Sequence, residues 1–127
     1  MLFRSRGEEY LHHPLRQVLA GEAGADGQHV GVVVAAGDCP RGIVICTTGI
    51  GISMAANKVH GIRCAHCADT VEARLTREHN DANMLAIGAG FTGELLALEM
   101  VDVFLNTPFS EGERHARRVA KVNAIQP

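Results

Sequence analysis

Short apolar runs and amphipathic segments alternate along the chain from about residue 29 onward. Residues 42–46 and 83–88 form short apolar runs, the first of them as expected for a strand buried on both faces, and residues 61–67 are predicted to form another strand. Apolar positions at helical spacing predict a helix over about residues 92–107, capping patterns predict helices over about 69–78 and 110–123, and residues 53–58 are predicted to start another. Strands that alternate with helices indicate an α/β fold, with a parallel sheet between two layers of helices in an α/β/α arrangement.

Polar residues predict where three of these helices begin. Asp69 and Glu72 stand three residues apart, which is the spacing of a capping box, and Ser110 and Glu113 repeat it. Thr92 precedes the longest predicted helix and is its expected N-cap. We therefore expect side-chain caps at the starts of all three helices.

The first 28 residues differ in character from the rest of the chain. They carry scattered charge and a glycine-rich run, with a helix predicted over about residues 8–19. Residues 30–36 are rich in valine and fit either a strand or the last turns of a helix. We expect an atypical segment over residues 1–28, poorly ordered or partly helical, followed by a domain over residues 29–127.

Composition limits the classes of protein that the chain can belong to. Its 127 residues are 46% apolar and 20% charged, which is typical of one globular domain. A net charge of −2 argues against general binding of nucleic acid, and no apolar stretch reaches the ~20 residues of a membrane helix. The start has no apolar signal region, so we expect the four cysteines to be reduced and the protein to be cytoplasmic.

The segment from Cys46 to Ser53, with the sequence CTTGIGIS, is the strongest candidate for chemistry. It places a cysteine where a predicted strand ends and a glycine-rich turn leads into a helix. Ligands of parallel sheets bind beyond the carboxyl ends of the strands, and amides at a helix start bind anions and lower the pKa of a nearby thiol. On spacing alone, a tight packing turn with an inert Cys46 fits equally well.

Two further polar segments are weaker candidates. Residues 77–83 include His79, which could exchange protons, and Asn80, which could bind hydroxyl groups. Arg114 and Arg118 share one face of the last predicted helix and could bind a phosphate. A polar helix end and a solvated basic face explain the same residues without any function.

A fourth candidate, Cys64-Ala65-His66-Cys67, has the spacing of half a zinc site. No second pair of this kind follows in the sequence. On a strand, Cys64 and Cys67 would point to opposite faces of the sheet, which disfavours a shared metal ion.

Three segments taken together resemble the type B ribose-5-phosphate isomerases and the related galactose-6-phosphate isomerases. The segments are residues 42–63, 77–83 and 107–118, in the same order and at similar spacing, and the resemblance covers about residues 29–123. It implies a Rossmann-like fold and an aldose–ketose isomerase that needs no metal or other cofactor. The implied reaction converts ribose 5-phosphate to ribulose 5-phosphate through an enediolate.

The resemblance also implies roles for individual residues. Cys46 matches the base that moves a proton between carbons 1 and 2, and His79 matches the residue that helps to open the sugar ring, with Thr48 nearby. Asn80 matches a contact to a substrate hydroxyl, and Arg114 and Arg118 match ligands of the phosphate. The backbone amides that match the anion hole for the enediolate belong to Thr47, Thr48, Gly49, Ile50 and Gly51.

The same resemblance implies an assembly. Members of the family form dimers or dimers of dimers, and each active site is completed by the partner subunit. We therefore expect a homodimer or tetramer with shared sites, a sugar phosphate as its small-molecule partner, and no binding to nucleic acid or membranes.

The chain departs from the family pattern in two places. The Asp-His-Ala-Gly motif of the family's first strand is absent, and Gly90 stands where an arginine is expected. Only 45 residues precede Cys46, whereas two strand–helix units need about 60. The first strand is therefore predicted to be missing or replaced, which would leave an open edge inside the sheet.

Alternatives to the main hypothesis follow from these departures. One is an impaired homologue that binds a sugar phosphate without turning it over. Another is an isomerase of a 6-phosphohexose, such as allose or galactose 6-phosphate. A small zinc module is the third.

Overall fold

The computed structural model describes residues 8–11, 18–21, 36–37 and 40–125. The strands are β1 (Glu8–Leu11), β2 (Val18–Gly21), β3 (Arg41–Cys46), β4 (Cys64–His66) and β5 (Met84–Gly88). The helices are α2 (Ile50–Ala56), α3 (Thr70–Asn80), α4 (Glu94–Asn106) and α5 (Glu113–Asn123). The strands form one sheet in the order β1-β2-β3-β5-β4.

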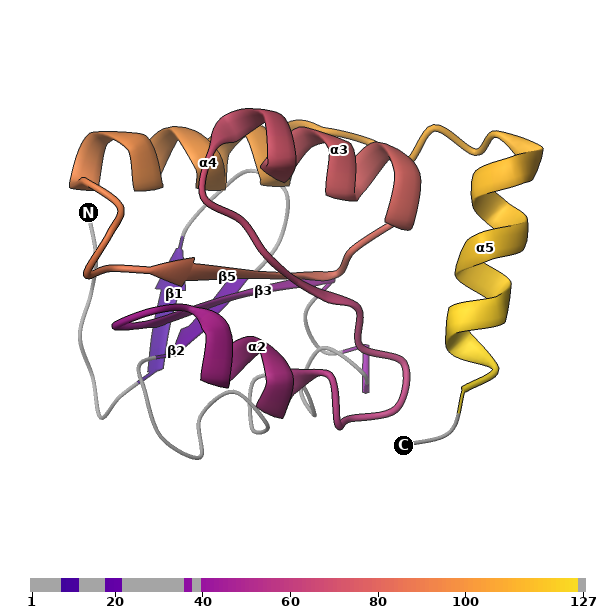
Figure 1. Cartoon of the computed structure of the whole chain (residues 1–127), viewed down its shortest axis with the longest axis horizontal. Helices are drawn as coiled ribbons and strands as arrows, with labels where there is room; N and C mark the ends of the chain where they lie inside the picture. Colours follow the sequence, from indigo (N-terminus) through magenta and orange to yellow (C-terminus); the bar gives the residue numbers. More distant parts are fainter. Residues whose placement is uncertain (1–7, 12–17, 22–35, 38–39, 126–127) are drawn as a thin grey trace.

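Strands β2, β3, β5 and β4 run parallel, and β1 pairs antiparallel with β2 at one edge. In the central pair, Gly42 lies opposite Met84 and Cys46 lies opposite Gly88, so the two strands end together. Helices α3 and α4 cover one face of the sheet and α2 covers the other (Figure 1). The predicted three-layer α/β fold is therefore confirmed.

Alternating residues of β3 and β5 build the core on both sides of the sheet. Ile43, Leu85 and Ile87 join one buried cluster with Met100 and Phe104 of α4. The residues between them face the other way and meet α2, in a cluster of Val44, Met84, Ala86, Ile52, Ala56 and Ile62. Because neighbouring side chains on a strand point to opposite faces, strands covered on both sides must be apolar throughout.

The helix predicted over about residues 8–19 is wrong where the structure describes this segment. Residues 8–11 and 18–21 are the strands β1 and β2, and β2 pairs in parallel with β3 from Val18↔Arg41 to Gly21↔Val44. The edge of β3 is therefore covered, not open as predicted. The backbone hydrogen bonds that these residues form with a neighbouring strand outweigh the weak local preference for a helix. Residues 30–35, the valine-rich segment, lie outside the described residues.

One of the three predicted helix caps is confirmed and two are wrong. The carboxylate of Asp69 accepts a hydrogen bond from the Glu72 amide at 2.7 Å and caps α3. Helix α4 begins after Gly93 without a side-chain cap, since the Thr92 amide donates to the Gly88 carbonyl in a turn. Helix α5 begins after Gly112, and Ser110 is occupied elsewhere because its hydroxyl donates to the carbonyl of Glu78 at 2.6 Å.

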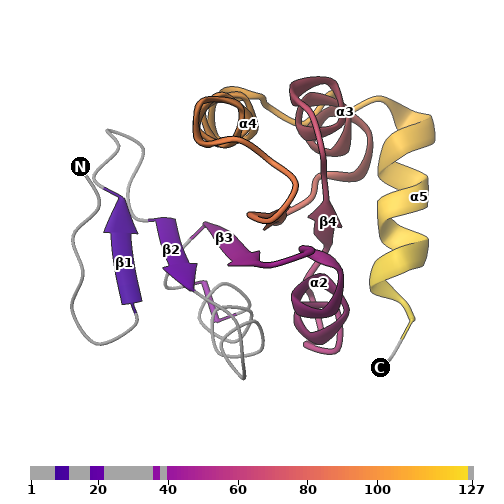
Figure 2. The same ribbon diagram turned by 60° about the vertical axis from the view of Figure 1, so that its left-hand side comes forward.

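Helix α5 stands beside the β4 edge of the sheet and buries none of its residues (Figure 2). Two tethers hold it. The Ser110 hydroxyl ties the loop before it to the end of α3, and the Arg63 guanidinium donates to the Asn123 side chain at 2.8 Å. No helix among the described residues combines the length and the apolar character needed to cross a membrane.

Candidate active site

The turn after β3 is fixed by backbone contacts to the end of β5. The Ala89 amide donates to the Cys46 carbonyl, and the Gly90 amide donates to the Thr47 carbonyl, both at 2.9 Å. A Cβ added at Gly88 would lie 2.5 Å from the Thr48 carbonyl oxygen. The two loops thus approach each other as closely as bare backbone allows, which positions Cys46 rigidly.

Gly49 shapes this turn and places a hydrogen bond on the candidate base. Its φ of 76° lies in the left-handed region that favours glycine, and an added Cβ would meet the His66 ring at 2.5 Å. With this geometry the Gly49 amide donates to Cys46 Sγ at 3.1 Å. Glycine is therefore required at position 49 for two reasons: the positive φ, and the lack of room for a Cβ atom beside His66.

The environment of Cys46 favours its thiolate. Burial raises the pKa of the Cys46 thiol, but hydrogen bonds from the amides of Gly49, Ile52 and Thr48 and from the Thr48 hydroxyl outweigh it, so the pKa is lowered. Cys46 is half-buried, so part of it remains accessible. A lowered pKa on an accessible thiol is the condition for a base or nucleophile.

The amides of the turn do not all remain free for a substrate. Gly49 donates to the thiol, and the Ile50 amide donates to the Thr48 hydroxyl oxygen at 3.2 Å. In the predicted anion hole, these two amides would have to share or exchange their acceptors when a substrate oxygen arrives. The Thr48 side chain therefore also stabilises the turn, through the hydrogen bond that it accepts from the Ile50 amide.

A second group of predicted site residues gathers where α3 ends and α5 begins. The rings of His79 and His115 stack with centroids 4.3 Å apart and planes within 3°. Burial lowers the pKa of His115, and the nearby charges of His79, Arg114 and Arg118 lower it further. The predicted ring-opening and phosphate residues thus come together in one chain.

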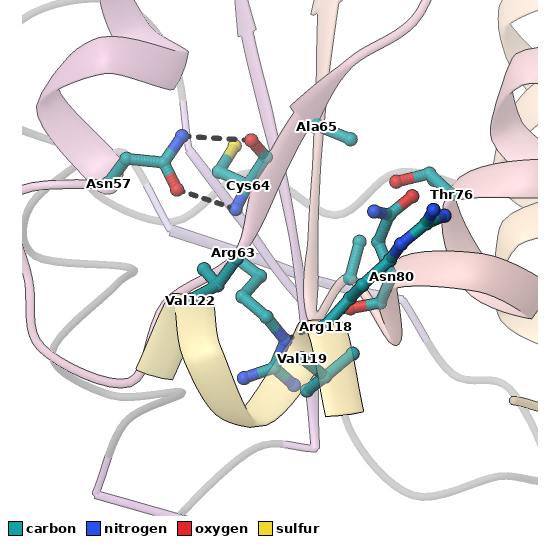
Figure 3. Close-up of a pocket in the computed structure, with 10 residues that line it drawn as sticks. Asn57, Arg63, Cys64, Ala65, Thr76, Asn80, Arg118, Val119 and Val122 are labelled. Carbon is teal, nitrogen blue, oxygen red and sulfur yellow. Dashed lines mark hydrogen bonds between the residues drawn. The ribbon is translucent and has the colours of Figure 1, made fainter. Parts of the chain in front are cut away.

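Asn80 and Arg118 line a cavity of about 260 Å³ between β4, α3 and α5 (Figure 3). The cavity is mostly apolar, and its other lining residues are Asn57, Arg63, Cys64, Ala65, Thr76, Ala82, Val119 and Val122. The side-chain amide of Asn57 pairs with both backbone groups of Cys64, at 2.8 and 2.9 Å, and so covers this edge of β4. Asn80 and Arg118 therefore line the same cavity.

The two groups lie at opposite ends of the sheet. The turn after Cys46 follows the carboxyl end of β3, whereas Asn80 leads into the amino end of β5. The length of β5 from Met84 to Gly88 alone separates these ends by roughly 13 Å. Figure 1 shows the start of α2 at one side of the molecule and α5 at the other. Within one chain, Thr48 is therefore not near His79, so a site that holds both residues would have to be completed by a partner subunit, as the resemblance implies.

Other residues of the 77–83 segment hold the fold together. The buried Arg77 donates to the Asp81 carboxylate at 2.8 Å, to the Ala82 carbonyl at 2.6 Å and to the Thr107 carbonyl at 3.2 Å. The Asn83 side chain accepts from the Arg63 amide at 2.8 Å. These bonds fix the end of α3 where it presents His79 and Asn80.

The cysteines of the half zinc motif separate as their spacing predicts. Cys67 packs in the core under α4, and Cys64 packs on the α2 face of the sheet. Burial raises the pKa of each thiol to about 12, so both stay protonated. In the described part of the chain, no three His, Cys, Asp or Glu side chains gather as a metal site would require.

His66, from the same motif, lies at the Cys46 end of the sheet, although the sequence assigned it no role there. It is the last residue of β4, is exposed, and packs its ring against Gly49. Its position at the carboxyl end of a strand next to β5 is the signal that could have identified it.

Comparison with known proteins agrees with this architecture. The profile of the Ribose/Galactose Isomerase family matches residues 25–122. The chain is 46% identical over 97 residues to ribose-5-phosphate isomerase B of Escherichia coli, covering 76% of this chain and 64% of that protein. It is 39% identical over 116 residues to D-erythrulose-4-phosphate isomerase of Pectobacterium atrosepticum, covering 91% and 68%.

A solved structure supports the same relationship. The structure of ribose-5-phosphate isomerase B from Clostridium thermocellum is 54% identical, with a TM-score of 0.75 over 78% of this chain and 67% of that one. The chain spans 60 to 64% of the length of the curated relatives from Bacillus subtilis and E. coli that it matches. Profile, identity and fold agree, and the chain belongs to the ribose/galactose isomerase family.

Proposed function

We propose that this chain catalyses aldose–ketose isomerisation of a phosphorylated sugar, with ribose 5-phosphate to ribulose 5-phosphate as its reaction. The observation that carries the proposal is the Cys46 thiol at the end of β3, which accepts the Gly49 amide at 3.1 Å and has a lowered pKa. A base with these properties, in a turn rich in amide donors, suits proton abstraction beside a carbonyl group.

In the proposed reaction the Cys46 thiolate removes the proton from carbon 2 of the open-chain aldose and returns it to carbon 1. The amides of the 47–51 turn stabilise the enediolate oxygen that forms between these steps. His79 helps to open the sugar ring, Asn80 binds a hydroxyl group, and Arg114 with Arg118 holds the phosphate. No cofactor takes part.

The proposed roles of Cys46 and of the His79 group can act on one substrate only if the residues come from two subunits. Cys46 and the His79 group lie at opposite ends of the sheet within one chain, too far apart to act on one small sugar phosphate. We propose a homodimer, or a tetramer built from such dimers, in which the Cys46 turn of one subunit faces the α3–α5 end of its partner. In a two-fold dimer, each contact of this kind occurs twice, so both sites would be complete.

An apolar stripe on α4 supports this assembly. Phe91, in the turn before α4, is 83% exposed, and Leu95 and Leu98, one turn apart on α4, are 80% and 54% exposed, so three large apolar side chains of this segment lie in water. The stripe begins directly after β5, at the same end of the sheet as Cys46. A second copy that buries it would come close to the Cys46 turn. We define Phe91, Leu95 and Leu98 as the α4 stripe.

The cytoplasm is the compartment we propose for this reaction. The three cysteines in the described residues, Cys46, Cys64 and Cys67, are free thiols, and the proposed chemistry needs Cys46 reduced. A reducing compartment keeps such thiols available.

The direct test measures conversion of ribose 5-phosphate by the wild-type chain and by Cys46→Ala. We expect turnover by the wild type and a loss of at least about 100-fold in the variant, because the proton at carbon 2 has no other base. Cys64→Ala is the matched control and should keep its kcat. A folded, assembled wild-type chain that isomerises no aldose phosphate would contradict the proposal.

The same preparation separates the alternatives. Stabilisation against heat by ribose 5-phosphate without any turnover would identify a homologue that only binds the sugar phosphate. Relative kcat/KM values for ribose 5-phosphate, allose 6-phosphate and galactose 6-phosphate decide which sugar length the site accepts. D-erythrulose 4-phosphate belongs in this series because a relative that covers 91% of the chain is named for it.

Sharing of sites between subunits is tested by mixing two inactive variants. Cys46→Ala lacks the base and His79→Ala lacks the ring-opening residue, so each homodimer should be inactive. After subunit exchange, one of the two sites in each mixed dimer is intact, and about a quarter of the wild-type activity should return. Mixtures that stay inactive despite subunit exchange would show that the sites are not shared in this way.

A further inference from the structure

The turn that holds Cys46 has a histidine packed against it. A Cβ added at Gly49 would lie 2.5 Å from Cδ2 and 2.8 Å from Nε2 of His66, so the imidazole edge covers the Cα of this glycine. The Gly49 amide, on the same residue, donates to Cys46 Sγ. One glycine therefore touches both the thiol and the imidazole, and the two side chains belong to one site.

His66 reaches this place because of the strand order. It ends β4, which pairs in parallel with β5, with His66 opposite Ala86. Strands β3, β5 and β4 thus present their carboxyl ends in a row, where ligands of parallel sheets bind. The side chain is exposed, and no described residue forms a hydrogen bond with its ring. Its nitrogen atoms are therefore available to a ligand.

The proposed isomerisation needs a second proton transfer that Cys46 does not perform. Cys46 moves a proton between two carbon atoms. The product also requires a proton on oxygen O1 that was absent from the aldehyde, and the loss of the proton from oxygen O2. Imidazole is the side chain best suited to give and take a proton near neutral pH.

We propose that His66 is a catalytic residue that transfers a proton between O2 and O1 of the sugar, an inference that rests on the isomerase function proposed above. The thiolate takes the proton from carbon 2, the C–H electron pair forms the C1–C2 double bond, and the carbonyl electron pair passes to O1 as the enediolate charge, which then takes a proton from the protonated imidazole. The neutral imidazole then takes the proton from O2, the carbonyl forms at carbon 2, and carbon 1 takes its proton from the Cys46 thiol. Both side chains end as they began.

Other charged groups border this end of the sheet. The Cys46 thiol lies in the adjoining turn, and the carboxylates of Asp69 and Glu72 lie at the start of α3, just after β4. Both carboxylates are engaged with backbone amides, Asp69 with that of Glu72 and Glu72 with that of Ala68 at 2.6 Å. Neither is thereby free to replace the imidazole as a proton carrier.

The experiment compares wild type with His66→Ala and His66→Gln in the assembled, full-length chain. We expect kcat for ribose 5-phosphate to fall about 10- to 100-fold in both variants, with KM changed less than about 3-fold. Added imidazole should restore kcat of His66→Ala, because the exposed position leaves room for the small base. It should not restore Cys46→Ala. His60→Ala, which removes another exposed histidine, should match the wild type with and without imidazole.

The outcomes separate the two proposals. An active wild type whose His66→Ala variant keeps full kcat would overturn the role of His66 and leave the isomerase proposal intact. A lost kcat that imidazole does not restore, in a variant with the wild-type melting temperature, would also overturn it, because a proton carrier can be replaced by a free base. A wild type that isomerises no sugar phosphate would overturn the isomerase proposal first, and the role of His66 with it.

Discussion

At the scale of single residues, the site depends on how backbone donors surround one sulfur atom. Gly49, Ile52 and Thr48 all direct hydrogen bonds to Cys46, and together they outweigh the burial that would keep the thiol protonated. Only a residue that accepts a φ of 76° can turn the chain so that its amide reaches Sγ at 3.1 Å. The reactivity of Cys46 is therefore a property of the turn rather than of the cysteine itself.

Removing the Thr48 hydroxyl tests this explanation. Alkylation by iodoacetamide follows the thiolate, so in the wild type its rate should rise with pH and reach its half-maximum below the pH typical of a free thiol. Thr48→Val deletes one donor that lowers the pKa of Cys46, and the half-maximum should move to higher pH. Thr47→Val removes a hydroxyl that does not bond the thiol and should leave the profile unchanged. Coincident profiles for all three proteins would contradict the assignment.

At the scale of elements, the connection between α3 and α4 positions the second group of site residues. Arg77 is 5% exposed and its guanidinium lies over the Phe104 ring, 5.7 Å from the centroid. It donates to carbonyl groups on both sides of the α3 end, at Ala82 and Thr107. A buried carbonyl group that loses its hydrogen-bond donor lowers the stability of the folded state. This arginine therefore holds α3, β5 and α4 together.

A pair of arginine variants on one helix tests this role. Arg77→Met keeps the apolar stem but removes the donors, and we expect the free energy of unfolding to fall by about 2 to 3 kcal/mol. Arg74→Met, on the exposed face, removes only the 2.9 Å ion pair with Glu78 and should cost less than about 0.5 kcal/mol. Urea unfolding curves measure both values. Equal losses for the two variants would show that Arg77 is not a tether.

Sequence patterns predicted the elements that carry apolar cores better than their ends. The runs at 42–46 and 83–88 became β3 and β5 almost residue for residue, because strands covered on both faces admit no polar side chain. The caps at Thr92 and Ser110 failed, since a local turn holds the Thr92 amide to Gly88 and a tertiary contact binds the Ser110 hydroxyl to Glu78 instead. A capping pattern is a local preference that such contacts override.

At the scale of the whole molecule, the predicted site residues lie at two opposite ends of the sheet, which the proposed dimer would bring together. Cys46 lies at the carboxyl end of β3, and the stacked His79 and His115 lie at the opposite end. The α4 stripe exposes large apolar side chains next to the first of these ends. Exposed apolar side chains that gather on one segment are typical of interaction sites, which is why we propose the α4 stripe as part of the subunit interface.

Charge placed on the α4 stripe should break the assembly. We expect Phe91→Glu and Leu95→Glu each to weaken self-association at least about 10-fold, because burial of an unpaired carboxylate opposes contact. Activity should fall in parallel with dimer content. Met54→Glu, on the α2 face, makes a comparable change at a site that is 63% exposed and should leave the dimer intact. Analytical ultracentrifugation measures both; an unchanged association constant in the stripe variants would place the interface elsewhere.

The sequence alone determined the α/β class, the strands that form the core, and the identity of the residues that the family resemblance selected. The first two features follow from side-chain chemistry and from spacing along the chain, which are local properties, and the third comes from the resemblance to the family. It did not determine that β2 covers the edge of β3, that His66 packs on Gly49, or that Cys46 and His79 lie at opposite ends of the sheet. The order of strands decided these points, because contacts between distant segments exist only once the sheet is assembled.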